Sequence, residues 1–190
     1  FTAENSASAT IDLQRASSNW EKLANTLGIL CDARQSIAQI ARNSNPVQLI
    51  HDMEFAESIR EDGRYLVTPP LVARDASILD HALKSKGISA IVLCREPTTQ
   101  LKLCPIVALG SGVTIRVQID EPDNPEKPLC GWFDNAVESL GAAVLSKLDT
   151  ETSFSRQLNF LLVHISAVPS CVDVYQAAIK LCNTLTSESV

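Results

Sequence analysis

The N-terminal third of the chain carries apolar residues at the three- and four-residue spacing of an amphipathic helix. Over residues 11–42 no proline interrupts this spacing, which predicts one long helix. Four of its apolar residues occupy the a and d positions of a heptad: Trp20, Leu23, Leu27 and Leu30. This stripe is too short for a free-standing coiled coil. We therefore expect helical packing against another protein chain to cover it.

A second helix is predicted directly after the first. Residues 43–46 end the long helix, and Asn45 is a suitable cap for a new helix that runs to about residue 60. Residues 1–10 have no periodic apolar face and are predicted to be a flexible tail. Residues 11–63 then form a helical hairpin, whose expected role is assembly with other subunits.

The middle of the chain changes to the two-residue alternation of β-strands. Three strands are predicted, over residues 88–95, 101–109 and 113–119. A tight Gly-Ser-Gly turn at residues 110–112 joins the last two strands and indicates a hairpin. The expected arrangement is an antiparallel meander with one face toward solvent.

The third of these strands is predicted to be an exposed sheet edge that binds a partner. Its polar residues Thr114, Arg116 and Gln118 alternate with apolar ones. Chain order puts the second strand between the other two, and a bulge at Pro105 would reconcile proline with that central place. The first strand is apolar on both faces and is expected to be covered, so residues 113–119 form the open edge.

Helices are predicted around the meander, and together these elements define the fold class. Residues 153–166 fit a helix, although residues 158–165 would equally fit a buried strand, and we take the helix. The other predicted helices are one capped by Asp75 and ended by Gly87, one over residues 132–148, and one capped by Ser170. The prediction is an α+β protein with an N-terminal helical hairpin followed by a small three-stranded antiparallel sheet packed with helices. Its globular domain spans residues 64–186, and residues 187–190 are a tail.

Charge and hydropathy exclude two classes of partner. The chain has 16 Lys plus Arg against 22 Asp plus Glu, a formal net charge of −6, whereas binding to nucleic acid backbones requires a basic face. No apolar run approaches the roughly 20 residues that span a bilayer. The serine-rich start has no basic residue before Arg15, so no signal peptide is predicted. We expect no direct nucleic acid partner and no membrane partner.

The residues that usually carry chemistry are not arranged for it. The six cysteines are widely spaced, and no Cys-x-x-Cys occurs. They are expected to be free thiols of an intracellular protein, and Cys94, Cys104 and Cys182, which follow apolar residues, are expected to be small buried hydrophobes. His51, His81 and His164 lie on three different predicted helices. We therefore predict no catalytic, cofactor-binding or metal-binding residues, no small-molecule substrate and no enzymatic activity.

Part of the chain resembles the Mediator subunit 27 family of transcription coregulators. The resemblance covers about residues 65–119: LVTPP, a helix with Asp75, Ile78 and Asp80, then ISAIVLCREPTTQLKL and ALGSGVTIRVQI, with a weaker echo in AIKLC near the end. It implies an N-terminal coiled-coil part, matching residues 11–61, and a C-terminal cysteine-rich segment with Cys-x-x-Cys, which is not found in residues 1–190. The family has no catalytic residues to carry over.

The resulting functional prediction is a non-enzymatic subunit of a nuclear multiprotein assembly, most specifically a Mediator subunit. It binds other subunits through its N-terminal helices and its sheet, with partner-binding residues Trp20, Leu23, Leu27, Leu30, Thr114, Arg116 and Gln118. A second hypothesis is an adaptor of a kinetochore or vesicle-tethering complex, because one small module serves many assemblies. A third is a small cytosolic enzyme. Cytoplasmic location is the alternative to nuclear.

Overall fold

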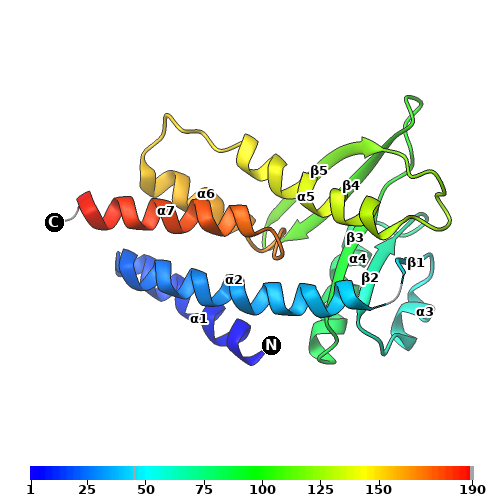
Figure 1. Cartoon of the computed structure of the whole chain (residues 1–190), viewed down its shortest axis with the longest axis horizontal. Helices are drawn as coiled ribbons and strands as arrows, with labels where there is room; N and C mark the ends of the chain where they lie inside the picture. The colour runs from blue at the N-terminus through cyan, green and yellow to red at the C-terminus, as the bar shows by residue number, and fades with distance from the viewer. Residues whose placement is uncertain (45, 189–190) are drawn as a thin grey trace.

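The computed structural model describes residues 1–44 and 46–188 of the chain. The molecule is elongated, with a helical bundle at one end and a β-sheet at the other (Figure 1). Asn45, the predicted helix cap, and residues 189–190 of the predicted C-terminal tail lie outside the described residues. The last helix, α7 (Val172–Glu188), extends into the rest of that tail.

The N-terminal pair of helices is present, but its bounds differ from the prediction. Helix α1 (Thr2–Ala16) occupies the predicted tail, and α2 (Trp20–Asn43) follows after a turn at residues 17–19. Ser18 in that turn has φ 53°, and the Asn19 side chain accepts a hydrogen bond from the Lys22 amide. The tail prediction is wrong because α1, despite its polar sequence, buries Glu4 and Ala7.

The apolar stripe of α2 is part of the internal core. Leu23, Leu27 and Leu30 are 0%, 0% and 1% exposed, in a cluster that contains residues of α1 and α7. Helix α2 lies along both of those helices (Figure 1). The prediction that another chain covers these leucines is therefore wrong, because this chain covers them itself.

The sheet has five strands, so the predicted three-stranded antiparallel sheet is wrong. Its strands are β1 (Gln48–Ile50), β2 (Gly63–Val67), β3 (Ala90–Arg95), β4 (Leu103–Gly110) and β5 (Val113–Asp120), and they lie in that order. Strands β1, β2 and β3 are parallel, while β4 and β5 continue the sheet antiparallel. Strand β1 has three residues, too few to show a two-residue alternation. Strand β2 has five residues that are all buried, because it is an internal parallel strand covered on both faces, and such strands do not alternate.

The second predicted helix and the predicted domain boundary are corrected by the same observation. Residues 48–50 are strand β1, and only Met53–Ser58 form a helix, α3. Because β1 pairs with β2, residues 11–63 are not a hairpin separate from the globular part. The sheet begins inside the segment that the sequence assigned to helical assembly.

Strand β3 is central, lying between β2 and β4, rather than at an edge as predicted. Strand β4 pairs with β5 in one unbroken register from Leu103 to Gly110, so the expected bulge at Pro105 is absent from that ladder. Pro105 is tolerated because it lies where the short β3–β4 ladder ends. At that point the Pro105 carbonyl accepts a hydrogen bond from the Glu96 amide at 2.9 Å. Proline has no N–H to donate to β3, but no residue pairs of β3 and β4 follow that this would interrupt.

Helices cover the two faces of the sheet unequally. Helix α4 (Ala73–Ser85) and α3 cover one face over β1 to β4, whereas α2 and α5 (Cys130–Ser146) lie on the other face.

Two helices correspond to predicted ones. Asp75 is the third residue of α4, and its carboxylate accepts a hydrogen bond from the Val72 amide, so Asp75 is not itself the N-cap residue. Helix α6 (Phe154–His164) packs on α7, which confirms the helical interpretation of residues 153–166.

A buried polar cluster connects three helices of the bundle. The Arg34 guanidinium on α2 donates to Glu4 Oε1 of α1 at 2.9 Å and to the Tyr175 hydroxyl of α7 at 2.7 Å. Tyr175 in turn donates to the Pro169 carbonyl at 3.1 Å. The Arg34 and Glu4 side chains are 14% and 9% exposed, so this ion pair is held inside the molecule.

We expect Leu27→Ala to lower the free energy of unfolding by about 2–5 kcal/mol, the usual result of emptying a buried leucine site. The matched control is Ile29→Ala on the same helix, whose side chain is 57% exposed and whose loss should change that free energy by less than about 0.5 kcal/mol. Urea unfolding measures both. Equal midpoints for Leu27→Ala and the parent protein would show that the stripe is not core.

Candidate protein-docking edge

Strand β5 is the open edge of the sheet, as the sequence predicted. It is last in the strand order and pairs with β4 alone. Thr114, Arg116 and Gln118 are all exposed, whereas Ile115 and Ile119 are buried in the main core. The predicted alternation of one wet and one buried side of this strand is confirmed.

The register shows which backbone groups of β5 face outward. In an antiparallel ladder, hydrogen-bonded pairs alternate with pairs whose N–H and C=O groups point away from each other. The two-residue turn makes Gly110 and Val113 a hydrogen-bonded pair, and the Glu121 amide donates to the Lys102 carbonyl in the same phase. The N–H and C=O groups of Thr114, Arg116 and Gln118 therefore point to the open edge.

In the part of the chain that the structure describes, the polar side of β5 is exposed along the strand. Helix α4 packs on β2, β3 and β4, and its layer ends before β5. Arg116 is 56% exposed by its side chain and forms an ion pair with Glu96 at 2.6 Å. Because the pair is exposed, it contributes little to stability. The side chains on this side of β5 are exposed to solvent, so an added strand would not have to displace a helix from them.

A groove begins where β5 ends. It has a volume of about 440 Å³ and is lined by Glu121, Pro122, Asp123, Asn124, Lys127, Leu129 and Trp132. The Trp132 indole N–H donates to the Asp120 carbonyl at 2.9 Å, which fixes the ring beside the last residue of β5. Leu129 is 71% exposed. The sequence predicts no site here, and the signal that could have found this groove is the apolar pair Leu129 and Trp132 directly after the proline-rich residues 120–128.

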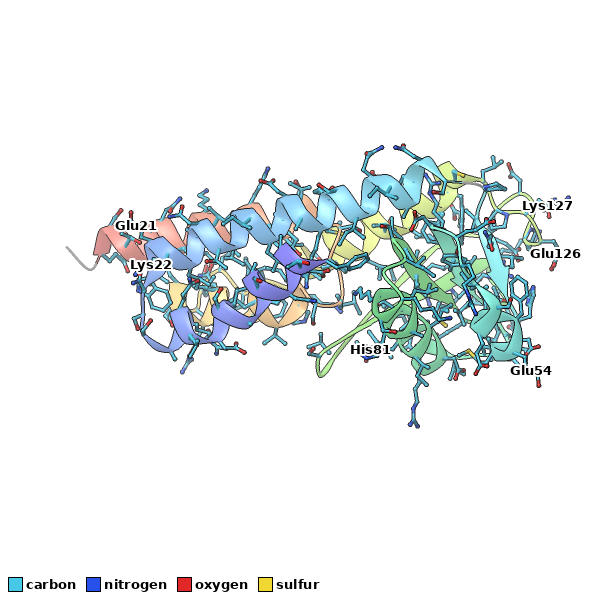
Figure 2. All side chains as sticks on the ribbon, turned by 90° about the horizontal axis from the view of Figure 1, so that it is seen from below. Glu21, Lys22, Glu54, His81, Glu126 and Lys127 are labelled. Carbon is cyan, nitrogen blue, oxygen red and sulfur yellow. The ribbon has the colours of Figure 1, made fainter. Side chains whose placement is uncertain are left out.

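The start of α2, where Trp20 lies, and the groove after β5 are at opposite ends of the molecule (Figure 2). Glu21 and Lys22, beside Trp20 at the start of α2, lie at one end, whereas Lys127 of the groove lies at the other (Figure 2). Trp20 is half-buried against the core. The structure thus leaves Thr114, Arg116 and Gln118 exposed and buries the leucines of the stripe.

The histidines are not brought together into a site. His51 follows β1 instead of lying on a helix, with its Nδ1 atom 2.6 Å from Thr68 Oγ1. His81 lies on the outer side of α4 (Figure 2), and His164 stacks on Phe160 with ring centroids 4.0 Å apart. Residues 1–44 and 46–188 contain no cluster of His, Cys, Asp or Glu suited to a metal ion.

The buried thiols are poor nucleophiles. Burial raises the pKa of Cys94 to about 12 and those of Cys104, Cys171 and Cys182 to about 11, so these groups stay protonated at neutral pH. All six cysteines are free, and all but Cys130 are buried. The expectation that Cys94, Cys104 and Cys182 behave as small buried hydrophobes is confirmed.

A cavity of about 80 Å³ lies where β3 and β4 diverge. Only Cys94 with Val107 and Arg95 with Ile106 form residue pairs between these strands, so the sheet opens toward the start of β3. The lining combines the strands with α2, α4, α5 and residues 166–171, and most of its side chains are small or apolar. The lining cysteine, Cys171, donates a hydrogen bond to the Val137 carbonyl at 3.3 Å.

A comparison with protein-family models, curated proteins and solved structures found no match. In the part of the chain that the structure describes, no helix combines the length and the apolar character needed to cross a membrane.

We expect the free energy of unfolding to fall as the pH rises above about 9. The folded thiols have a pKa raised from 9.0 to about 11 or 12. Above pH 9 the unfolded state therefore binds fewer protons than the folded state, and unfolding becomes easier. Urea unfolding from pH 8 to 11 measures this, and Cys94→Ala should make the dependence on pH shallower. A constant urea midpoint up to pH 10.5 would contradict the burial of these thiols.

Proposed function

We propose that this protein is a non-enzymatic subunit of a multiprotein assembly and that it binds another protein by strand addition at β5. The observation that carries the proposal is the open edge itself: eight residues long, with three consecutive outward N–H and C=O pairs. An extended segment of another protein would complete these hydrogen bonds and continue the sheet.

The contrast between the two edges of the sheet supports this function. Proteins usually protect sheet edges by keeping them short or by interrupting them with proline or a bulge. Strand β1, at the other edge, is three residues long. Strand β5 has no proline and no break in its ladder with β4. A long open edge of this kind is a liability in a free protein and is useful in a subunit.

The role of the N-terminal helices changes accordingly. Their apolar stripe is covered by α1 and α7, so they support the sheet from inside this chain. Docking through the sheet edge takes the place of docking through the leucines. The proposed partner is still another protein, and the proposed contact is backbone hydrogen bonding.

The resemblance to Mediator subunit 27 suggests which assembly this is. It covers about residues 65–119, the segment that forms α4, β3, β4 and most of β2 and β5. A Mediator subunit acts in transcription by RNA polymerase II and is located in the nucleus. Identification of Mediator subunits among the proteins that co-purify through β5 would support this assignment, and their absence from that set would contradict it.

We expect Arg116→Pro to lower the amount of partner recovered by affinity purification by about tenfold or more, the effect of losing about 1.4 kcal/mol of binding energy. Proline removes the outward N–H and blocks the edge, while the ladder to β4 does not use that N–H. Gln118→Pro makes the same change at the next free amide. Arg74→Ala, an exposed arginine on α4, controls for the loss of charge.

Purification from cells followed by mass spectrometry identifies the recovered proteins, and urea unfolding confirms that each variant is folded. Recovery of the same proteins in the same amounts with folded Arg116→Pro, folded Gln118→Pro and the parent chain would contradict strand addition at β5.

A further inference from the structure

The groove beside Trp132 is continuous with the open edge of β5. Glu121 and Pro122 follow the last residue of the strand directly and line the groove, and Trp132 is hydrogen-bonded to Asp120. A segment that pairs with β5 and continues past Asp120 therefore enters the groove. The edge and the groove form one docking surface.

We infer that this groove is the anchor pocket of the docking site and that it takes one large aliphatic or aromatic side chain of the strand-adding partner. The inference rests on the proposed function, because the partner segment reaches the groove along β5. Peptides that add to a sheet edge gain affinity from backbone hydrogen bonds and specificity from side-chain pockets. The groove supplies the side-chain pocket and therefore the specificity.

The chemistry of the groove selects an apolar side chain. Leu129, Pro122 and the ring of Trp132 form its apolar lining. The indole N–H is already donated to the Asp120 carbonyl, so Trp132 offers its ring and no free donor. Leu129 is 71% exposed, and covering it together with an apolar anchor removes the surface of both from water.

The order of the partner motif follows from an added strand that runs antiparallel to β5. An antiparallel addition continues the pattern of β3, β4 and β5. The N-terminal side of the added segment then lies beside the C-terminal end of β5, where the groove is. The anchor residue therefore precedes the strand-forming residues that face Gln118, Arg116 and Thr114.

Charge adds a preference beside the anchor. The groove carries the carboxylates of Glu121 and Asp123 against the single ammonium group of Lys127, and the chain has a net charge of −6. A Lys or Arg next to the anchor residue meets an acidic rim, whereas an acidic residue there is repelled. The partner motif is a large apolar residue with a basic neighbour, followed by an extended segment.

A second copy of this chain fits the site poorly. If two β5 strands pair antiparallel about Val117, the residue that faces Pro122 is Gly112 of the second copy, by the residue spacing of the ladder. The turn at residues 110–112 is Gly-Ser-Gly, which has no apolar side chain to fill the groove. The occupant that suits both edge and groove is a segment of a different protein.

Selection from a phage-displayed library of random 12-residue peptides on the full chain tests this inference. We expect the selected peptides to share an apolar residue with a basic neighbour, N-terminal to a β-prone run. Leu129→Asp should weaken their binding by about tenfold or more. It should leave the fold intact, because residue 129 is the N-cap of α5 and aspartate is a favoured cap. Ile29→Asp, at an exposed position on α2, is the control and should leave affinity unchanged.

The outcomes separate the anchor pocket from the edge. Peptides that protect the amides of Thr114, Arg116 and Gln118 from exchange, but bind Leu129→Asp as tightly as the parent chain, would overturn the pocket and keep strand addition. A selection without any peptide that protects these amides would overturn both. Dimerisation in sedimentation experiments that Arg116→Pro abolishes would identify a second copy as the occupant and overturn the proposed partner.

Discussion

The burial of the α2 leucines between α1 and α7 is the contact on which the remaining structure depends. Helix α2 has 24 residues, about 36 Å at 1.5 Å per residue, so one end lies in the bundle while the other reaches β2 and β3. At the far end the buried Arg64 of β2 donates to the Arg42 carbonyl at 2.9 Å and forms an ion pair with Asp134 of α5 at 3.2 Å. The bundle and the sheet are therefore one unit, and the leucines of the α2 stripe are not available to a partner.

This arrangement leaves the sheet edge as the part of the molecule suited to binding. Helices α3 and α4 stop short of β5, and α5 covers only its inner side. Most of the backbone N–H and C=O groups that have no partner strand are thus on one long edge strand, β5, which lies beside an apolar groove. The open edge and the groove have different structural causes. The open edge results from the order of the strands, whereas the groove is formed by the loop at residues 121–129 and the start of α5. In the proposed docking surface, the edge would supply affinity and the adjacent groove would supply selectivity.

The elements with strong local patterns could be predicted from the sequence, and those determined by distant contacts could not. The meander strands and the edge position of β5 follow from clear alternation and a Gly-Ser-Gly turn. Helix α1 has almost no apolar face and is held by Glu4 and Ala7 against the bundle, which no local pattern reveals. Strand β1 is three residues long and forms by pairing with β2. The spacing of Leu23 and Leu27 predicts a buried face, but spacing alone does not say which chain buries it.

The most direct measurement of the central claim is residue-resolved amide hydrogen exchange of the isolated protein, observed by nuclear magnetic resonance. The register predicts fast exchange at Thr114, Arg116 and Gln118, whose N–H groups face the open edge, and slow exchange at Ile115, Val117 and Ile119, which bond to β4. Slow exchange at all six positions would show that the edge is already paired or covered, and would contradict the account of β5 as the docking strand.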